Sequence, residues 1–428
     1  MEKGDGKMSD EWEKSFSRVA NQVVHSMQER SSHGTARGVE QAPIVKLVDM
    51  LLEHAVDMRA SDVHIEPRKD ALFFRYRIDG LLCECHGPLS AKLQSILISR
   101  LKIMAKMDTS EHQKPLDGHI VHIYKGKKLD FRVASMPVQH GEALVIRILN
   151  AGQELRAIEE LGMTEENERL FRRLIHAPSG MLIVTGPMNS GKTTTLYAAL
   201  QELNIPERHI MTLEDPVEQQ VHGINQIEVH EKAGLTFATG LRSMLRMDAD
   251  CIMIGEARDT ETAQIAIRAA LTGHLLLTTL HAKDSCNALF RLLEMGVRPY
   301  LLAATARGII AQRLVRRLCP YCREVYEVMP DSAEGLFLKE HGARAGKYYR
   351  SVGCEKCRDT GFAGRLAIHE ILALNEELHV EIMRGESVEG FQRAALDHGL
   401  RTMAMDGCEK ARQGLTTLQE VRRVLYGC

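Results

Sequence analysis

The feature of this sequence that most constrains its fold is the run of residues 186–193, which read G-P-M-N-S-G-K-T. They match the phosphate-loop pattern G-x-x-x-x-G-K-[S/T] at every defined position. An apolar run at 181–184 favours a buried strand before the loop, and residues 194–203 are rich in helix formers. This order directs backbone N–H groups and an open helix N-terminus at phosphate oxygens. The stretch predicts a nucleoside triphosphate site rather than a turn that binds no ligand, because the strand, the loop and the helix follow one another in the order that such a site requires.

The loop residues have separate expected roles. Lys192 would lie against the β- and γ-phosphates, and Thr193 would place its hydroxyl on Mg²⁺. The nucleotide is expected to contact the whole loop and the residue after it, namely Gly186, Pro187, Met188, Asn189, Ser190, Gly191, Lys192, Thr193 and Thr194.

Composition excludes several classes of protein. A formal net charge of −2 over 428 residues does not suit a chain that coats nucleic acid, so no nucleic-acid partner is expected. The basic run at 313–317 is interpreted as a helix face. No apolar run approaches the ~20 residues that span a bilayer, and the polar N-terminus does not resemble a signal peptide. We expect a cytoplasmic protein whose membrane contact runs through partners.

Apolar periodicity divides the chain into five segments. They are a polar tail, an N-terminal α/β domain, a charged linker, an α/β core and a C-terminal helical region, which span residues 1–41, 42–150, 151–160, 161–305 and 306–428. A tail is favoured over a short docking helix for the first segment, although residues 16–27 are weakly amphipathic. Beyond about Ala303 the pattern is helical, interrupted by a cysteine-bearing insertion.

Both α/β segments have recognisable elements. In the N-terminal domain the alternating pattern predicts strands at 61–67, 72–78, 119–124, 129–135 and 143–149. In the core, strands and helices alternate as a parallel sheet requires. The expected strands after the loop are 209–213, 251–254 and 275–279, and the expected helices are 237–246, 260–271 and 285–295.

Acidic residues end two of the core strands, at the edge where open α/β sheets bind ligands. Glu214 lies just past the predicted end of the first strand, and Glu256 follows the second. In many phosphate-loop enzymes an acid at such a position helps to hold Mg²⁺. Because Gly255 precedes it, Glu256 would organise the metal through water or orient the attacking water. Each acid taken singly is equally well explained as a solvated residue at a strand end.

Two histidines flank the next strand. His281, just past its end, is placed to contact the γ-phosphate, whereas His274 at its head is expected to fix the strand entry. A lone histidine is usually structural. Arg258 and other arginines of the core are candidates for phosphate contacts, although arginines on helix surfaces are common.

Longer motifs resemble a known family. Residues 236–250 read TFATGLRSMLRMDAD and residues 255–263 read GEARDTETA. They resemble the signature of the type II secretion and type IV pilus assembly ATPases, the general secretion pathway protein E group. The resemblance runs from about Pro43 to the C-terminus. It implies a RecA-like core, a homohexameric ring at the cytoplasmic face of the inner membrane, and ATP hydrolysis that moves a polytopic platform protein to extrude pilin or pseudopilin subunits.

The resemblance also implies roles for individual residues. Glu214 falls in the family's acidic box, Glu256 in its Walker B box, and His274 and His281 in its histidine box. Arg132 and Arg147 match arginines that the N-terminal domain lends to the phosphates; without the resemblance they are arginines on the polar face of strands. The implied catalytic residues are Lys192, Glu214, Glu256, His281, Arg132 and Arg147.

Cysteines form two C-x-x-C pairs, Cys319 with Cys322 and Cys354 with Cys357. Two such pairs in a chain without a leader favour metal over disulfides, and four thiolates suit structural Zn²⁺. The same four cysteines match the family's tetracysteine zinc module.

Departures from the family pattern leave alternatives open. The loop has Met188 and Asn189 where the family usually has Thr-Gly, and Asn tolerates the left-handed conformation better than most residues. Only about 40 residues precede the region that resembles the family, where many members carry a long N-terminal docking domain, so the usual mode of recruitment is not expected. A pilus retraction motor of the same fold is one alternative, disfavoured by the cysteine pairs. A weakly hydrolysing, ATP-binding regulatory subunit is another, motivated by Met188 and Asn189.

Overall fold

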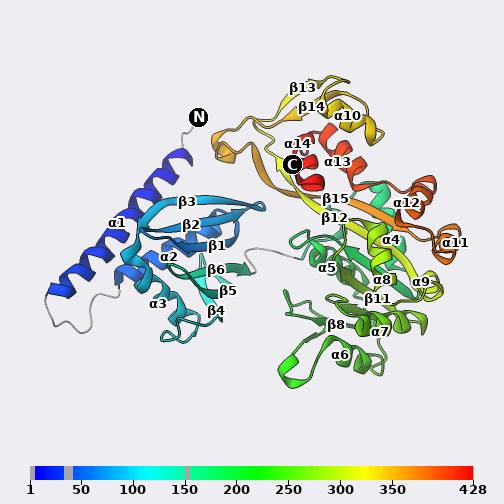
Figure 1. Cartoon of the computed structure of the whole chain (residues 1–428), viewed down its shortest axis with the longest axis horizontal. Helices are drawn as coiled ribbons and strands as arrows, with labels where there is room; N and C mark the ends of the chain where they lie inside the picture. Colours follow the sequence, from blue (N-terminus) through cyan, green and yellow to red (C-terminus); the bar gives the residue numbers. More distant parts are fainter. Residues whose placement is uncertain (1–4, 33–41, 150–154, 428) are drawn as a thin grey trace. The chain divides into compact units, whose positions relative to one another are not determined.

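A computed structural model describes residues 5–32, 42–149 and 155–427 of the chain. The chain separates into two compact units, residues 1–153 and residues 154–428 (Figure 1). The boundary between them falls inside the predicted linker, 151–160, of which residues 151–154 lie outside the described part.

The first unit is built on an antiparallel sheet of six strands in the order β3-β2-β1-β6-β5-β4. Their bounds are β1 Ala60–Pro67, β2 Ala71–Ile78, β3 Leu81–Ser90, β4 Leu116–Tyr124, β5 Lys127–Val138 and β6 Gly141–Leu149. Helices α2 (Ala42–Asp57) and α3 (Gln94–Met104) contribute to the same apolar core as one face of the sheet. Phe131 and Val133 are buried, whereas Arg132 between them is exposed. The alternating pattern in the sequence therefore places apolar residues on the buried face of the sheet and polar residues on the exposed face.

Residues 5–32 form a helix, α1 (Asp5–Ser32), so the interpretation of the first segment as a tail is wrong for this range. Residues 1–4 and 33–41 lie outside the described part. Phe16 and Val23 are buried in the core of the unit, and Trp12 stacks on His54 of α2 with ring centroids 3.6 Å apart. The apolar residues recur at helical spacing along one face, and the many charges on the other face make the segment polar on average.

The second unit contains a seven-stranded sheet in the order β15-β12-β7-β11-β10-β8-β9, parallel except for β15. The strands are β7 Gly180–Thr185, β8 Ile210–Glu214, β9 Asn225–Glu228, β10 Cys251–Ile254, β11 Leu275–Leu280, β12 Ala306–Leu318 and β15 Phe362–Ala373. The helices of the core are α4 Glu165–Ile175, α5 Lys192–Leu203, α6 Phe237–Met244, α7 Thr260–Leu271, α8 Ser285–Glu294 and α9 Pro299–Thr305. The predicted core strands and helices are confirmed to within two residues.

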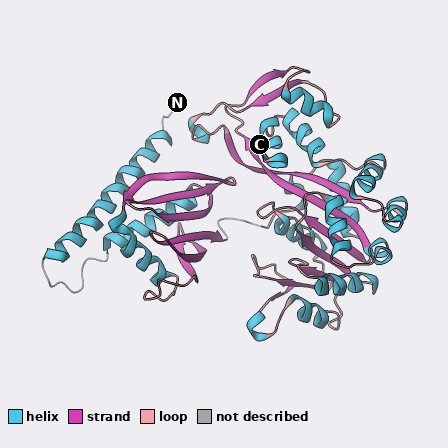
Figure 2. Ribbon diagram, in the orientation of Figure 1, coloured by secondary structure: helices cyan, strands magenta, loops and turns pink. Residues whose placement is uncertain are grey.

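The region beyond Ala303 contains strands as well as helices (Figure 2). Residues 306–318 form β12 and residues 362–373 form β15, so helix was the wrong prediction for both ranges. The basic run 313–317 therefore lies on a strand and not on a helix face. The region beyond Ala303 also contains a separate pair of strands, β13 Glu324–Val328 and β14 Gly346–Arg350. The helices of this region after β12 are α10 Ala333–Glu340, α11 Glu376–Arg384, α12 Val388–Asp397, α13 Met403–Arg412 and α14 Leu418–Tyr426.

Among the described residues, no helix has the length and apolar character that crossing a bilayer requires.

Candidate nucleotide site and four-cysteine cluster

The loop between β7 and α5 has the backbone shape of an anion-binding turn. Gly191 at the N-cap of α5 has φ 88°, and Asn189 has φ 60°, the left-handed conformation that Asn tolerates. A Cβ on Gly186 would lie 2.4 Å from the carbonyl oxygen of Gln312, so only glycine fits there. Met188 projects into solvent with 82% of its surface exposed.

Lys192 begins helix α5 and folds back over the loop. Its Nζ donates to the carbonyl oxygens of Gly186 and Pro187, both at 3.0 Å. Burial lowers the pKa of this ammonium, and the carboxylates of Glu256 and Glu218 partly oppose that change. This half-buried ammonium donates its hydrogen bonds to two neutral carbonyls, which suits it to an incoming anion.

Two further observations fit phosphate and metal at this turn. Thr193 and Thr194 are half-buried in the first turn of α5, and Ser190 Oγ is buried with no hydrogen-bond partner among the described residues. The loop thus presents a cation, hydroxyl groups and the positive end of a helix at one point.

Glu214, at the end of β8, is buried within a hydrogen-bond network of the protein. One of its carboxylate oxygens accepts from Thr212 Oγ1 at 2.6 Å and from Gln226 Nε2 at 3.2 Å, and the other accepts from the Tyr197 hydroxyl. Burial and this carboxylate raise the pKa of Tyr197. Tyr197 and Gln226 were not predicted from sequence, because nothing local distinguishes them from other residues of a helix and a strand.

Glu256 follows β10 at the same sheet edge and is in contact with two cationic or titratable side chains. His281 Nε2 lies 3.3 Å from one of its carboxylate oxygens, and the Arg258 guanidinium pairs with the other. Arg258 also contacts Asp215 at 3.3 Å. The structure therefore brings together Glu256 and His281, which the sequence placed at the ends of adjacent strands.

His274 lies at the opposite end of β11 from His281. Its Nδ1 is 3.1 Å from the carbonyl oxygen of Ala269 and 3.3 Å from the hydroxyl of Thr272. These contacts tie the end of α7 to the start of β11, in keeping with the structural role expected for this residue.

Arg132 and Arg147 are paired across strands β5 and β6 of the first unit. Both side chains lie on the exposed face of the sheet. Arg147 Nε donates to Asp62 Oδ1 at 3.1 Å, and Asp62 also accepts from the hydroxyl of Ser61. Delivery of these arginines to phosphate stays a prediction.

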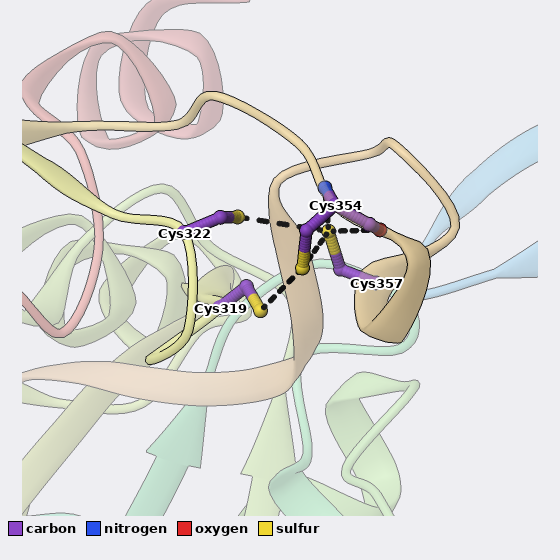
Figure 3. A group of neighbouring side chains, drawn as sticks. All are labelled: Cys319, Cys322, Cys354 and Cys357. Carbon is purple, nitrogen blue, oxygen red and sulfur yellow. Dashed lines mark hydrogen bonds between the residues drawn. The ribbon is translucent and has the colours of Figure 1, made fainter. Parts of the chain in front are cut away.

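The four predicted cysteines converge at one point in the second unit (Figure 3). Cys319 and Cys322 follow β12, and Cys354 and Cys357 precede β15. All four sulfurs lie within 4.8 Å of one another, and three of the pairs are 3.7–3.9 Å apart. Four sulfurs held ~2.3 Å from one tetrahedral ion are about 3.8 Å apart, so the spacing fits Zn²⁺.

The backbone around Cys357 favours the thiolate form of that residue. Burial alone would raise the pKa of Cys357, but the backbone N–H groups of Cys354 and Gly361 each donate to its Sγ at 3.2 Å. Together with neighbouring sulfurs they lower its pKa to about 7. Burial raises the pKa of Cys322, in the same cluster, to about 12, and it does the same to the core thiols of Cys251 and Cys408.

The family described as "Type II/IV secretion system protein" matches residues 37–423. The chain belongs to that family. It is an ATPase. It is 45% identical over 385 residues to the type II secretion system ATPase E of Vibrio cholerae, which covers 90% of this chain and 76% of that protein.

Two further similarities place this secretion-family ATPase among its relatives. It is 43% identical over 392 residues to the type IV pilus assembly ATPase PilB of Myxococcus xanthus, over 90% of this chain and 68% of that one. A solved structure of the pilus retraction motor PilT with bound ADP aligns with a TM-score of 0.58 at 25% identity, covering 87% of this chain and 94% of PilT. The predicted family and α/β fold are confirmed.

Proposed function

We propose that this ATPase is a Mg-ATP-dependent, homohexameric motor that powers assembly of pilin-like subunits and protein secretion in a type II secretion or type IV pilus-like system. The observation that carries the proposal is the conjunction of the loop around Lys192 with the Glu256–His281 pair at the same sheet edge. The secretion ATPase of Vibrio cholerae and the pilus assembly ATPase of Myxococcus xanthus are similar to this chain at 45% and 43% identity. They support ATP hydrolysis as the energy source, and the proposal therefore names both kinds of machine.

The residues would divide the work of phosphoryl transfer. The loop and Lys192 would hold the β- and γ-phosphates, and Thr193 would ligate Mg²⁺, which supplies positive charge to the phosphate oxygens. Glu256 would orient the attacking water, with His281 beside it. Glu214 would act from within its network, so we assign it a supporting role.

Charge for the transition state would come from arginine. Within the second unit, Arg258 is engaged by Glu256 and Asp215. Arg132 and Arg147 of the first unit would supply the charge to the phosphates, as the family resemblance implies.

Location and partners follow the same proposal. The motor would work in the cytoplasm at the inner-membrane face, and its contact with the membrane would run through a polytopic platform protein. We propose structural Zn²⁺ at the four cysteines, where it would join the chain after β12 to the chain before β15. This cluster also favours an assembly motor over a retraction motor.

Binding of a hydrolysis-resistant ATP analogue with Mg²⁺, followed by calorimetry, tests the nucleotide site. The Lys192→Ala variant is expected to bind at least about tenfold more weakly, because it loses a charge-assisted contact to phosphate. Lys339→Ala, an exposed lysine of α10, is the matched control and should bind as the wild type does. Equal affinity of the Lys192 and Lys339 variants would overturn the assignment. Light scattering with nucleotide present tests the hexamer, and a purely monomeric chain would contradict it.

A further inference from the structure

Gln312 lies in the middle of β12 and is 1% exposed, an unusual place for an amide side chain. Its Nε2 donates to the carbonyl oxygen of Ser190 at 2.8 Å, and its Oε1 accepts from the hydroxyl of Thr195 at 2.7 Å. Thr195 Oγ1 in turn lies 3.3 Å from the carbonyl oxygen of Gly191. One side chain therefore spans the end of the phosphate loop and the first turn of the helix after it.

Gln312 also packs against the two glycines of the loop, through its backbone carbonyl at Gly186 and its side-chain amide at Gly191. Its carbonyl oxygen would lie 2.4 Å from a Cβ on Gly186, and its Nε2 would lie 3.1 Å from a Cβ on Gly191. Both glycines that bracket the loop are thus packed against the same residue of a neighbouring strand. The register supports this, because Ala311 of β12 is paired with Thr185, the residue immediately before the loop.

We propose that Gln312 is a positioning residue for the ATPase reaction, which holds the phosphate loop in its anion-binding shape through a donor and an acceptor on one amide. The inference rests on the nucleotide site proposed above. An open loop of this kind directs its N–H groups inward and its carbonyls outward, and the outward carbonyl of Ser190 needs a buried donor. Gln312 supplies that donor.

The chemistry of the amide makes a discriminating test. In Gln312→Leu both hydrogen bonds disappear at nearly constant volume. Gln312→Glu keeps an acceptor for Thr195 but sets a carboxylate against the carbonyl of Ser190. When that carboxyl is protonated it again offers one donor and one acceptor, so the glutamate variant should recover as the pH falls.

Other charged groups near Gln312 do not imitate this recovery. His369 stands at the paired position on β15. Burial and the charge of Lys410 hold the pKa of His369 well below the ordinary value, which favours the neutral ring. Lys192 of the loop is present in the wild type and in every variant. Its effect on affinity therefore cancels when a variant is compared with the wild type at the same pH.

Affinity for Mg-ADP, measured by calorimetry as a ratio to the wild type at each pH, is the readout. Gln312→Leu should bind about tenfold more weakly at both pH 6 and pH 8, the effect of roughly one buried hydrogen-bond partnership. Gln312→Glu should be weaker than Gln312→Leu at pH 8 and should approach the wild type at pH 6. A ratio for Gln312→Glu that does not change with pH would overturn the proposal.

A control separates positioning from general destabilisation. Val315→Ala removes buried volume from the same strand at a side chain that packs with Ile368 and Met403, not with the loop. It should lower the thermal midpoint and leave affinity for Mg-ADP unchanged. Equal losses of affinity in Val315→Ala and Gln312→Leu would show that Gln312 acts only through stability. Absence of Mg-ADP binding by the wild type would instead refute the nucleotide site itself.

Discussion

A buried carboxylate joins the C-terminal helix to the strand that carries Gln312. Glu420 of α14 accepts from the guanidinium of Arg423 at 2.6 and 2.8 Å, from the guanidinium of Arg316 at 2.9 Å and from the Arg316 backbone N–H at 3.1 Å. Its side chain is 1% exposed. The residue to change is therefore Glu420, to glutamine, which keeps the shape and removes the charge.

The magnitude follows from the shift of its pKa. Burial alone would raise the pKa of Glu420, but the hydrogen bonds from Arg423 and Arg316 outweigh it and lower the pKa from 4.5 to about 2. At about 1.4 kcal/mol per pH unit, the folded state gains about 3 kcal/mol at pH 7. Because the folded pKa is the lower one, this stability is present above pH 4.5 and is lost as the pH falls toward 2.

Urea unfolding followed by far-UV circular dichroism measures the effect, since the single tryptophan lies in the first unit. Glu420→Gln should lower the free energy of unfolding by about 3 kcal/mol at pH 7 and by only about 1 kcal/mol at pH 3. Glu409→Gln removes the partner of Arg412 in a more exposed pair and should cost less than about 1 kcal/mol. A loss for Glu420→Gln that matches the control, or that is equal at the two pH values, would refute the reasoning.

Three further predictions concern the helix at the N-terminus, the cysteines and the loop. Phe16→Ala should destabilise the first unit by about 3–5 kcal/mol, seen as earlier unfolding by Trp12 fluorescence; unchanged unfolding would mean that α1 is not part of the core. Purified protein should hold about one Zn²⁺ per chain, and Cys354→Ser should lose it and melt earlier; metal-free wild type of equal stability would contradict the site. Asn189→Val should bind Mg-ATP more weakly than Asn189→Gly, because a β-branched residue resists φ 60°; equal binding would show that the loop does not need this shape.

Local pattern predicted the parts of this protein whose partners are close in sequence. The phosphate loop, the strand 251–254 before Glu256 and the two C-x-x-C pairs carry their signals within a few residues. The resemblance added Arg132 and Arg147, which no local pattern singles out, and it indicated the family.

Features that depend on contacts between residues far apart in the sequence could not be predicted from local pattern. The apolar run through Ile309 and Ile310 suits either a buried helix or a strand, and pairing with β7 and β15 makes it a strand. Gln312 was missed for the same reason, since its partners at Ser190 and Thr195 lie more than a hundred positions away. The network that buries Glu214 likewise depends on Tyr197 and Gln226 from other elements.

Phosphate release by the wild type and by Glu256→Gln tests most directly whether this chain hydrolyses ATP with Glu256 at the reacting water. The wild type should release phosphate in a Mg²⁺-dependent manner, and the variant should bind nucleotide normally yet turn over at least about a hundredfold more slowly. Wild-type release no faster than that of Glu256→Gln would exclude this role of Glu256 and favour a nucleotide-binding regulatory subunit.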